Sequence, residues 1–152
     1  MPYPAAFALI ALGLSAGLLA GCGPGAAPTA ADAERAAKLL AELPAPYASA
    51  DPARGRSLYA LCSACHQMKE GGANMVGPNL YGIFDAAAAA KPGFAYSDAL
   101  KASGWTWDAA RLDAWLENPQ AALPGTKMVF VGIKDPAQRA DLIAHLKVAG
   151  TP

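Results

Sequence analysis

Two cysteines and a histidine stand close together in the chain, as Cys62, Cys65 and His66 in the order C-x-x-C-H. On a helix, thiols three positions apart lie on neighbouring sides of one turn, where both can add to the two vinyl groups of one porphyrin. The following residue then directs its imidazole toward the iron. The spacing therefore predicts one haem c, attached covalently through Cys62 and Cys65, with His66 as an axial ligand.

Two other chemistries use cysteines at this spacing. A redox-active disulfide between Cys62 and Cys65 is expected beside a βαβ pattern, which the sequence does not contain. Half of a zinc site would need further ligands, and the second of the two histidines is the distant His145. The complete motif therefore favours haem attachment.

A haem iron also needs a second axial ligand, or it stays open on its other side. The candidates are Met68, Met75, Met128 and His145. Met68 follows His66 too closely to reach the far face of the ring, and Met75 lies in a glycine-rich loop on the same side. His145 stands among apolar residues at helical spacing, which favours packing. Met128 lies in a turn-rich loop that can fold over the far face, so it is the predicted ligand.

The beginning of the chain is typical of an export signal. Ala5 to Ala20 carry no charge, and this run is short for a membrane span, which needs about 20 residues. The segment Leu19-Ala20-Gly21-Cys22 resembles the lipobox of bacterial lipoproteins, in which the cysteine is lipidated and becomes the mature N-terminus. We expect residues 1–21 to be a lipoprotein-type export signal and Cys22 to carry a lipid anchor. A plain signal peptide cut nearby and an uncleaved anchor are the alternatives.

Residues 22–50 are rich in alanine and proline, and we expect a tether with one short helix. Helical spacing of leucines predicts this helix over Ala30–Leu43, ended by Pro44 and followed by an extended link. We interpret the helix as a solvated spacer without a binding role. Residues 51–152 are long enough for one domain. They predict an all-α fold with almost no sheet, with helices over residues 51–65, 98–102, 108–118 and 136–148.

The composition excludes several classes of protein. Lys+Arg 12 and Asp+Glu 12 balance to zero net charge, so nothing argues for a nucleic-acid partner. Apolar residues make up 54% of the chain, too many for disorder throughout. Three cysteines in 152 residues rule out a disulfide-dense scaffold. A compact domain with a cofactor is compatible with all three observations.

Taken together, these motifs resemble class I cytochrome c of the mitochondrial and bacterial c2-like kind. The resemblance covers residues 51–149 in five blocks, which follow the family order: 55–66, 77–80, 92–99, 124–128 and 141–146. It implies the class I cytochrome c fold, in which three to five helices wrap around a covalently attached haem c. It also implies a close crossing of the first and last helices, with Gly55, Tyr59 and Leu142 at the contact.

The resemblance implies further haem contacts at matching positions. The Pro78 carbonyl would accept a hydrogen bond from the free ring N–H of His66 and so fix its orientation. Tyr96 and Trp107 match positions that contact a haem propionate, and Thr126 matches a hydroxyl near the distal ligand. Each of these residues is therefore expected at the cofactor.

Several positions depart from the family pattern. Ala86 stands where the family often has an arginine near a propionate, so the compensation of that charge is open. Trp115 and Leu100 stand where a tyrosine and an asparagine often support a water network near the methionine. We expect Trp115 to contact the cofactor and both changes to make that side drier and less polar. His145 replaces a common tyrosine and should still pack.

The lysine-rich face that is typical of the family has fewer lysines in this chain. Leu61 and Gln120 occupy places that are often lysine, whereas Lys127 and Lys134 remain near the expected haem edge. From Asp51 onward there are 10 basic and 9 acidic residues. We therefore expect docking to depend little on charge steering.

Histidine and methionine ligands leave no open coordination position, which favours electron transfer over catalysis. The resemblance implies a one-electron carrier, not an enzyme, that shuttles electrons from a quinol–cytochrome c reductase to a terminal oxidase. We expect a monomer on the periplasmic side of a bacterial membrane, anchored by lipid at Cys22 or otherwise soluble. The alternatives are a haem-c subunit of a larger oxidoreductase, and a peroxide- or gas-reactive haem with a labile methionine.

Overall fold

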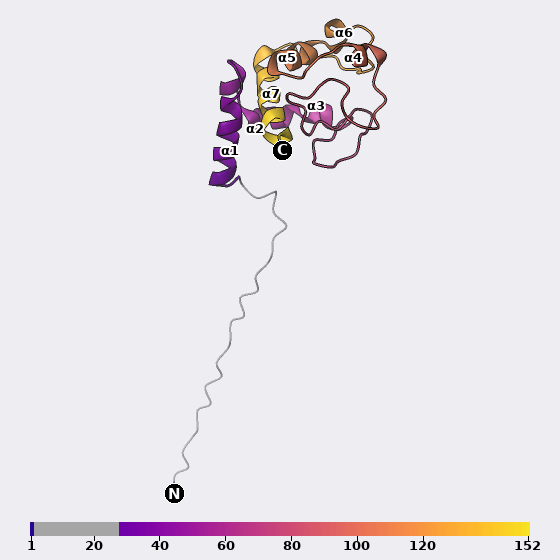
Figure 1. Ribbon diagram of the computed structural model, residues 1–152. Coiled ribbons are helices and arrows are strands. Elements are labelled where there is room, and N and C mark those ends of the chain that lie inside the picture. Colours follow the sequence, from indigo (N-terminus) through magenta and orange to yellow (C-terminus); the bar gives the residue numbers. More distant parts are fainter. Residues whose placement is uncertain (2–27) are drawn as a thin grey trace.

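The computed structural model of the chain describes Met1 and residues 28–152, so the expected export signal and Cys22 lie outside the described residues. Figure 1 shows a helical half beside a half made largely of loops. The helical elements of the described part are α1 (Ala30–Ala41), the 3-10 turn η1 (Tyr47–Ser49), α2 (Pro52–Leu58), α3 (Ala60–Ser63), α4 (Asp98–Ala102), α5 (Ala109–Glu117), α6 (Pro119–Ala122) and α7 (Pro136–Gly150).

The main helices of the expected domain are confirmed, with small changes at their ends. The helix expected over residues 51–65 is divided into α2 and the single turn α3. Asp108 caps α5, since its side chain accepts a hydrogen bond from the backbone N–H of Arg111 at 2.7 Å. Pro119 follows the end of α5 and occupies the first turn of α6, where its missing N–H costs nothing.

Helices α2 and α7 cross at very short range, and Gly55 makes this possible. A Cβ atom at Gly55 would lie 2.0 Å from the backbone oxygen of Asp141 and 2.7 Å from Cβ of His145. The Asp141 carboxylate also accepts a hydrogen bond at 2.7 Å from the Arg54 side chain. Leu142 is fully buried beside this contact. The helix crossing implied by the family resemblance is therefore present.

His145 is a packing residue of this helix pair, as expected. Its side chain is 6% exposed, and its ring centre lies 5.7 Å from that of Tyr59. Burial lowers the pKa of His145 below its ordinary value, and the nearby Arg56 guanidinium acts in the same direction. The folded protein therefore holds this imidazole in its neutral form near pH 7.

The burial of His145 predicts a loss of stability in mild acid. The unfolded chain binds a proton near pH 6.5, whereas the folded chain resists it to lower pH, so stability is present above about pH 6.5 and falls as the pH drops below it. Urea unfolding of the holoprotein at pH 7.5 and 5.5 should show this decline. The variant His145→Tyr should show a smaller decline, and equal declines in the two proteins would contradict the assignment.

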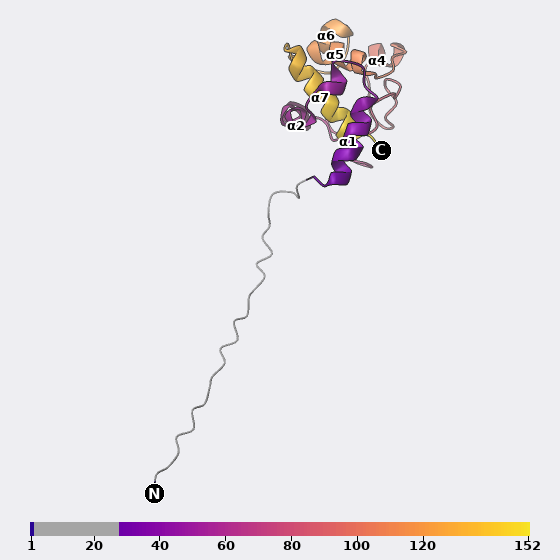
Figure 2. The same cartoon turned by 90° about the vertical axis from the view of Figure 1, so that its left-hand side faces the viewer.

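Helix α1 is docked on the domain, so the expectation of a solvated spacer is wrong. Figures 1 and 2 show α1 beside α7 from two directions. The Arg35 guanidinium donates to the backbone oxygens of Val148 at 3.1 Å and Thr151 at 2.8 Å. Glu42, just after the helix, forms a 2.7 Å ion pair with the buried ammonium of Lys147. These contacts join the N-terminal segment to the last helix.

The segment after α1 is also part of the packed structure. Leu43 is buried in the core cluster, and Tyr47 is half-buried against it at η1. The extended link expected over residues 44–50 is therefore replaced by a short turn. No helix in the part of the chain that the structure describes is long and apolar enough to cross a membrane.

The run of alanines at residues 86–90 is a loop, and backbone hydrogen bonds fix its position. Asp85 N–H donates to Trp107 O at 3.0 Å, Trp107 N–H returns to Ala86 O at 3.0 Å, and Ala88 N–H donates to Trp105 O at 2.8 Å. These bonds form an isolated β-bridge in an otherwise irregular segment. The loop is therefore held against the residues that precede α5.

Candidate cofactor site

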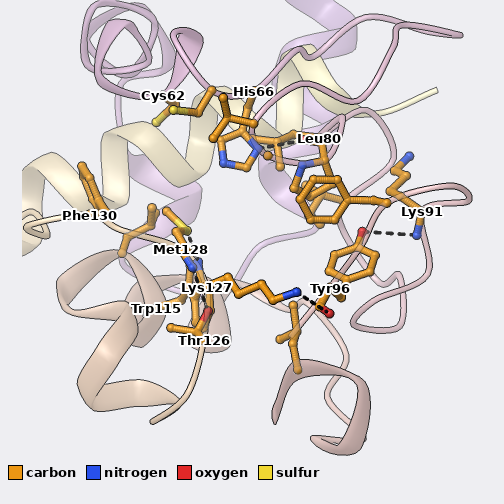
Figure 3. A pocket seen from close by; sticks show the side chains of 18 of the residues that line it. Cys62, His66, Leu80, Lys91, Tyr96, Trp115, Thr126, Lys127, Met128 and Phe130 are labelled. Atoms are coloured by element: carbon orange, nitrogen blue, oxygen red, sulfur yellow. Dashed lines mark hydrogen bonds between the residues drawn. The ribbon is translucent and has the colours of Figure 1, made fainter. Parts of the chain in front are cut away.

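The loop-rich half encloses a cavity of about 290 Å³, many times the space that one buried water needs. Figure 3 shows side chains from distant parts of the sequence converging on it. The walls are formed by the C-x-x-C-H segment, the loops around residues 76–83, 91–97 and 126–130, and helix α5. Most of these side chains are apolar, so the cavity suits a large apolar ligand.

His66 forms one wall with its ring already oriented. Nδ1 lies 2.7 Å from the Pro78 backbone oxygen, so an Nδ1–H donated there leaves Nε2 free to bind a metal. Burial lowers the pKa of His66, which keeps the imidazole neutral as a metal ligand must be. A Cβ at Gly77 would lie 2.2 Å from Cε1 of His66, so the glycine lets the loop approach the ring. The hydrogen bond to Pro78 is present as expected.

Cys62 and Cys65 line the same cavity and are not bonded to each other. Burial raises the pKa of the Cys62 thiol to about 11. Redox-active thiols have lowered pKa values, so the environment of Cys62 does not favour a reactive dithiol. It agrees better with a pair of cysteines placed against a ligand in the cavity.

Met128 is the methionine that faces the cavity, among those that the structure describes. Met68 packs into the core, and Met75 is 44% exposed outside the cavity. The Gln120 side chain donates to the backbone oxygen of Met128 at 2.9 Å, and Met128 N–H donates to the Thr126 hydroxyl at 3.2 Å. The methionine loop is therefore fixed from both sides.

The donor set is that of a haem c site. Two cysteines, an imidazole and a thioether sulfur face one apolar cavity, and no zinc-like cluster of His, Cys, Asp or Glu occurs in the described residues. The sequence model of the family described as Cytochrome c matches residues 52–149. The chain belongs to the cytochrome c family. It therefore carries one covalently bound haem c, and Cys62 and Cys65 have the spacing of its attachment motif.

Relatives with known names agree with this family. The chain is 51% identical over 100 residues to cytochrome c2 of Rhodomicrobium vannielii, which covers 66% of this chain and 80% of the relative. It is 43% identical over 109 residues to cytochrome c2 of Blastochloris viridis, covering 72% of this chain and 86% of the relative. Among solved structures, cytochrome cH from Methylobacterium extorquens is similar, with 50% identity and a TM-score of 0.60. That match covers 64% of this chain and 97% of cytochrome cH.

These comparisons confirm the all-α class I cytochrome c fold and one covalent haem c. The three to five helices expected around the haem correspond to α2, α4, α5 and α7, with α3 and α6 as additional single turns. The relatives are electron-transfer proteins, so this cytochrome is an electron carrier and not an enzyme.

Trp115 departs from the sequence-based expectation for the methionine side of this cytochrome. Its indole N–H donates a hydrogen bond to Sδ of Met128 at 3.1 Å, although the residue is only 7% exposed. The position is therefore buried but keeps a polar donor, whereas the sequence suggested a less polar site. Leu100 lines the cavity without such a group.

The far end of the cavity is formed around Tyr96. Tyr96 and Trp107, which the resemblance matches to positions at a haem propionate, are buried and line the cavity. The Tyr96 hydroxyl accepts a hydrogen bond from the backbone N–H of Lys91 at 3.3 Å. Lys127 donates from its ammonium to the backbone oxygens of Ala95 at 3.3 Å and Tyr96 at 3.4 Å. Lys91 was not among the expected site residues.

A partly buried ion pair holds the segment that follows the methionine loop. Arg139 of α7 contacts Asp113 of α5 through two hydrogen bonds of 2.9 and 3.2 Å. The same guanidinium donates to the backbone oxygens of Ile133 and Lys134, each at 3.0 Å. This double role ties the end of the loop to both helices.

Proposed function

We propose that this cytochrome transfers single electrons through an iron ligated by His66 and Met128. The observation that supports the pair most strongly is that both side chains face one cavity from separate segments (Figure 3). When bound, the haem supplies a one-electron ferric–ferrous couple. A thioether ligand stabilises the ferrous form, so a positive reduction potential is expected.

The protein contributes a rigid shell around these two ligands. Pro78 fixes the orientation of His66, while Gln120 and Thr126 fix the backbone at Met128. A shell that keeps its geometry leaves little to reorganise when the charge changes. The direct test of ligation is the ferric absorption spectrum of the holoprotein, where methionine–iron ligation gives a band near the red edge of the visible range. Absence of this band would remove the proposal.

The residues at the rim of the cavity indicate what kind of partner surface the protein can dock to. Leu61, Val76 and Val129 line the cavity and are 58%, 79% and 95% exposed, so the rim is apolar. The ammonium groups of Lys127 and Lys134 both donate to backbone oxygens nearby. Such a rim favours contact with an apolar docking face more than long-range attraction.

We infer that a quinol–cytochrome c reductase is the donor and a terminal oxidase the acceptor, at the periplasmic side of a bacterial membrane. The bacterial cytochromes c2 among the relatives support this assignment. A lipid on Cys22 would hold the monomeric carrier near these complexes and replace charge steering by a high local concentration.

The apolar rim predicts a weak dependence of electron transfer on ionic strength. The rate at which isolated membranes oxidise the reduced protein should change by less than about twofold between 20 and 200 mM salt. The variant Leu61→Lys adds a charge at the rim and should make the dependence steeper. A rate of the native protein that falls steeply with salt would contradict apolar docking.

A further inference from the structure

The charged side chains that line the haem cavity all have the same sign. Among the described residues that line it, the charged side chains are the lysines Lys91 and Lys127, and no carboxylate is present. A haem carries two propionate carboxylates, on the half of the ring away from the vinyl groups that react with cysteines. A carboxylate enclosed by apolar walls is costly unless a cation or hydrogen-bond donors compensate it.

The position that often supplies this cation in the family is neutral in this chain, because it is Ala86. Lys91 follows in the same loop and reaches the Tyr96 end of the cavity. Figure 3 shows Lys91 beside Tyr96 and away from Cys62 and His66. The propionate half of the ring is expected at this end, since the cysteines hold the other half.

The structure also fixes the Lys91 side chain in place. Its ammonium donates to the backbone oxygen of Tyr81, and its backbone N–H donates to the Tyr96 hydroxyl. The residue is half-buried, so its charge is less screened than that of a lysine in water. The ammonium of Lys127 donates to the backbone oxygen of Tyr96 at 3.4 Å, so a second lysine charge lies beside this residue.

We propose that Lys91 compensates the haem propionate charge in this chain, in place of a cation at position 86. This goes beyond the proposed function, because it depends on the haem lying in the cavity and not on Met128 as a ligand. The Lys91 charge disfavours the ferric form, which has one positive charge more than the ferrous form. Loss of this charge should therefore lower the reduction potential.

The variant Lys91→Gln tests this in the full-length holoprotein, because glutamine keeps a hydrogen-bond donor but removes the charge. In a redox titration at pH 7, the ferric-to-ferrous ratio at a fixed applied potential should rise about three- to tenfold, where tenfold corresponds to about 59 mV for one electron. Lys91→Arg should keep the native potential. Lys101→Gln is the matched control, because Lys101 is exposed, paired with Asp98 and outside the cavity.

Two further readouts separate charge compensation from a structural role. The potential of Lys91→Gln should depend more strongly on pH between 5 and 8, because the propionate pKa rises without its cation and protonation then raises the potential. Adding Ala86→Arg to Lys91→Gln should return the potential toward the native value. If Lys91→Gln yields no holoprotein, recovery of holoprotein in the double variant supports the proposal, and no recovery contradicts it.

The proposal would be overturned by a potential in Lys91→Gln equal to that of Lys101→Gln, with normal haem content. An equal shift in Lys91→Arg would also overturn it, because that variant keeps the charge. No rescue by Ala86→Arg, in a Lys91→Gln protein whose potential is lowered, would show that the lysine acts through the loop backbone and not through its charge.

Discussion

Replacing Met128 with alanine is expected to abolish the ferric absorption band near the red edge of the visible range and to let the reduced protein bind CO rapidly. The variant removes the methionine sulfur that faces the cavity and leaves the iron with His66 as its ligand from the protein. The reduction potential should fall by on the order of 0.1 V or more, since axial ligands set haem potentials over a range of about 0.8 V. Optical spectra and a redox titration measure both effects.

Met75→Ala is the matched control for this experiment, because Met75 is partly exposed and does not line the cavity. It should leave the spectrum and the potential unchanged. An unaltered spectrum in Met128→Ala would show that another group occupies the sixth position. Rapid CO binding by the native protein would instead favour a reactive haem with a labile methionine, and would count against a simple carrier.

Replacing Gly55 with alanine is expected to destabilise the protein by about 2–3 kcal/mol, although alanine is the better helix former. On an exposed helix this change would gain about 1 kcal/mol. At the crossing of α2 and α7, the new Cβ would lie 2.0 Å from the Asp141 backbone oxygen, so the helices must separate. Urea unfolding of the holoprotein, followed by circular dichroism, gives the free energy of unfolding.

Ser57→Ala serves as the control for helix propensity, because Ser57 is an exposed residue of the same helix. Its effect should stay within about 0.5 kcal/mol. A free energy of unfolding in Gly55→Ala equal to or above the native value would mean that the crossing of the two helices can accommodate a Cβ atom.

The haem attachment motif could be predicted from the sequence because its chemistry leaves a local pattern. Cys62, Cys65 and His66 are neighbours in the chain, and one helical turn places them together. Met128 could be selected as the proposed second ligand by elimination, since Met68 and Met75 lie too near His66 in the sequence, and it lines the cavity. The apolar residues at helical spacing around His145 likewise indicated α7, because such spacing is a local pattern.

The supporting contacts could not be predicted, because each joins residues whose proximity only the tertiary structure creates. From the sequence, Gln120 is only a position where the family often has a lysine. In the structure, its side chain donates to the backbone of the methionine loop. Trp115 is expected at the cofactor as a less polar replacement of a tyrosine, whereas the geometry directs its N–H at Met128. Lys91 lies in a loop with no periodicity, so no pattern in the sequence indicated its place at the cavity.

Helix α1 was predicted as a helix but not as part of the folded body. None of its residues is fully buried, and Leu40 alone among them packs against the core cluster as a partly buried side chain. The contacts that attach it involve backbone oxygens at the end of α7 and an ion pair just beyond its own last turn. Such contacts leave no periodic signal.

The docking of α1 also limits how far the haem could travel from a lipid surface. A free chain from Cys22 to Asp51 would span at most about 100 Å, at roughly 3.4 Å for each residue. Because the folded body begins at the Thr29 cap of α1, only the seven steps from Cys22 to Thr29 are left, or about 25 Å. With a lipid on Cys22, this short tether would keep the domain close to the bilayer. Only partners whose docking faces lie near the lipid headgroups would then be within its reach.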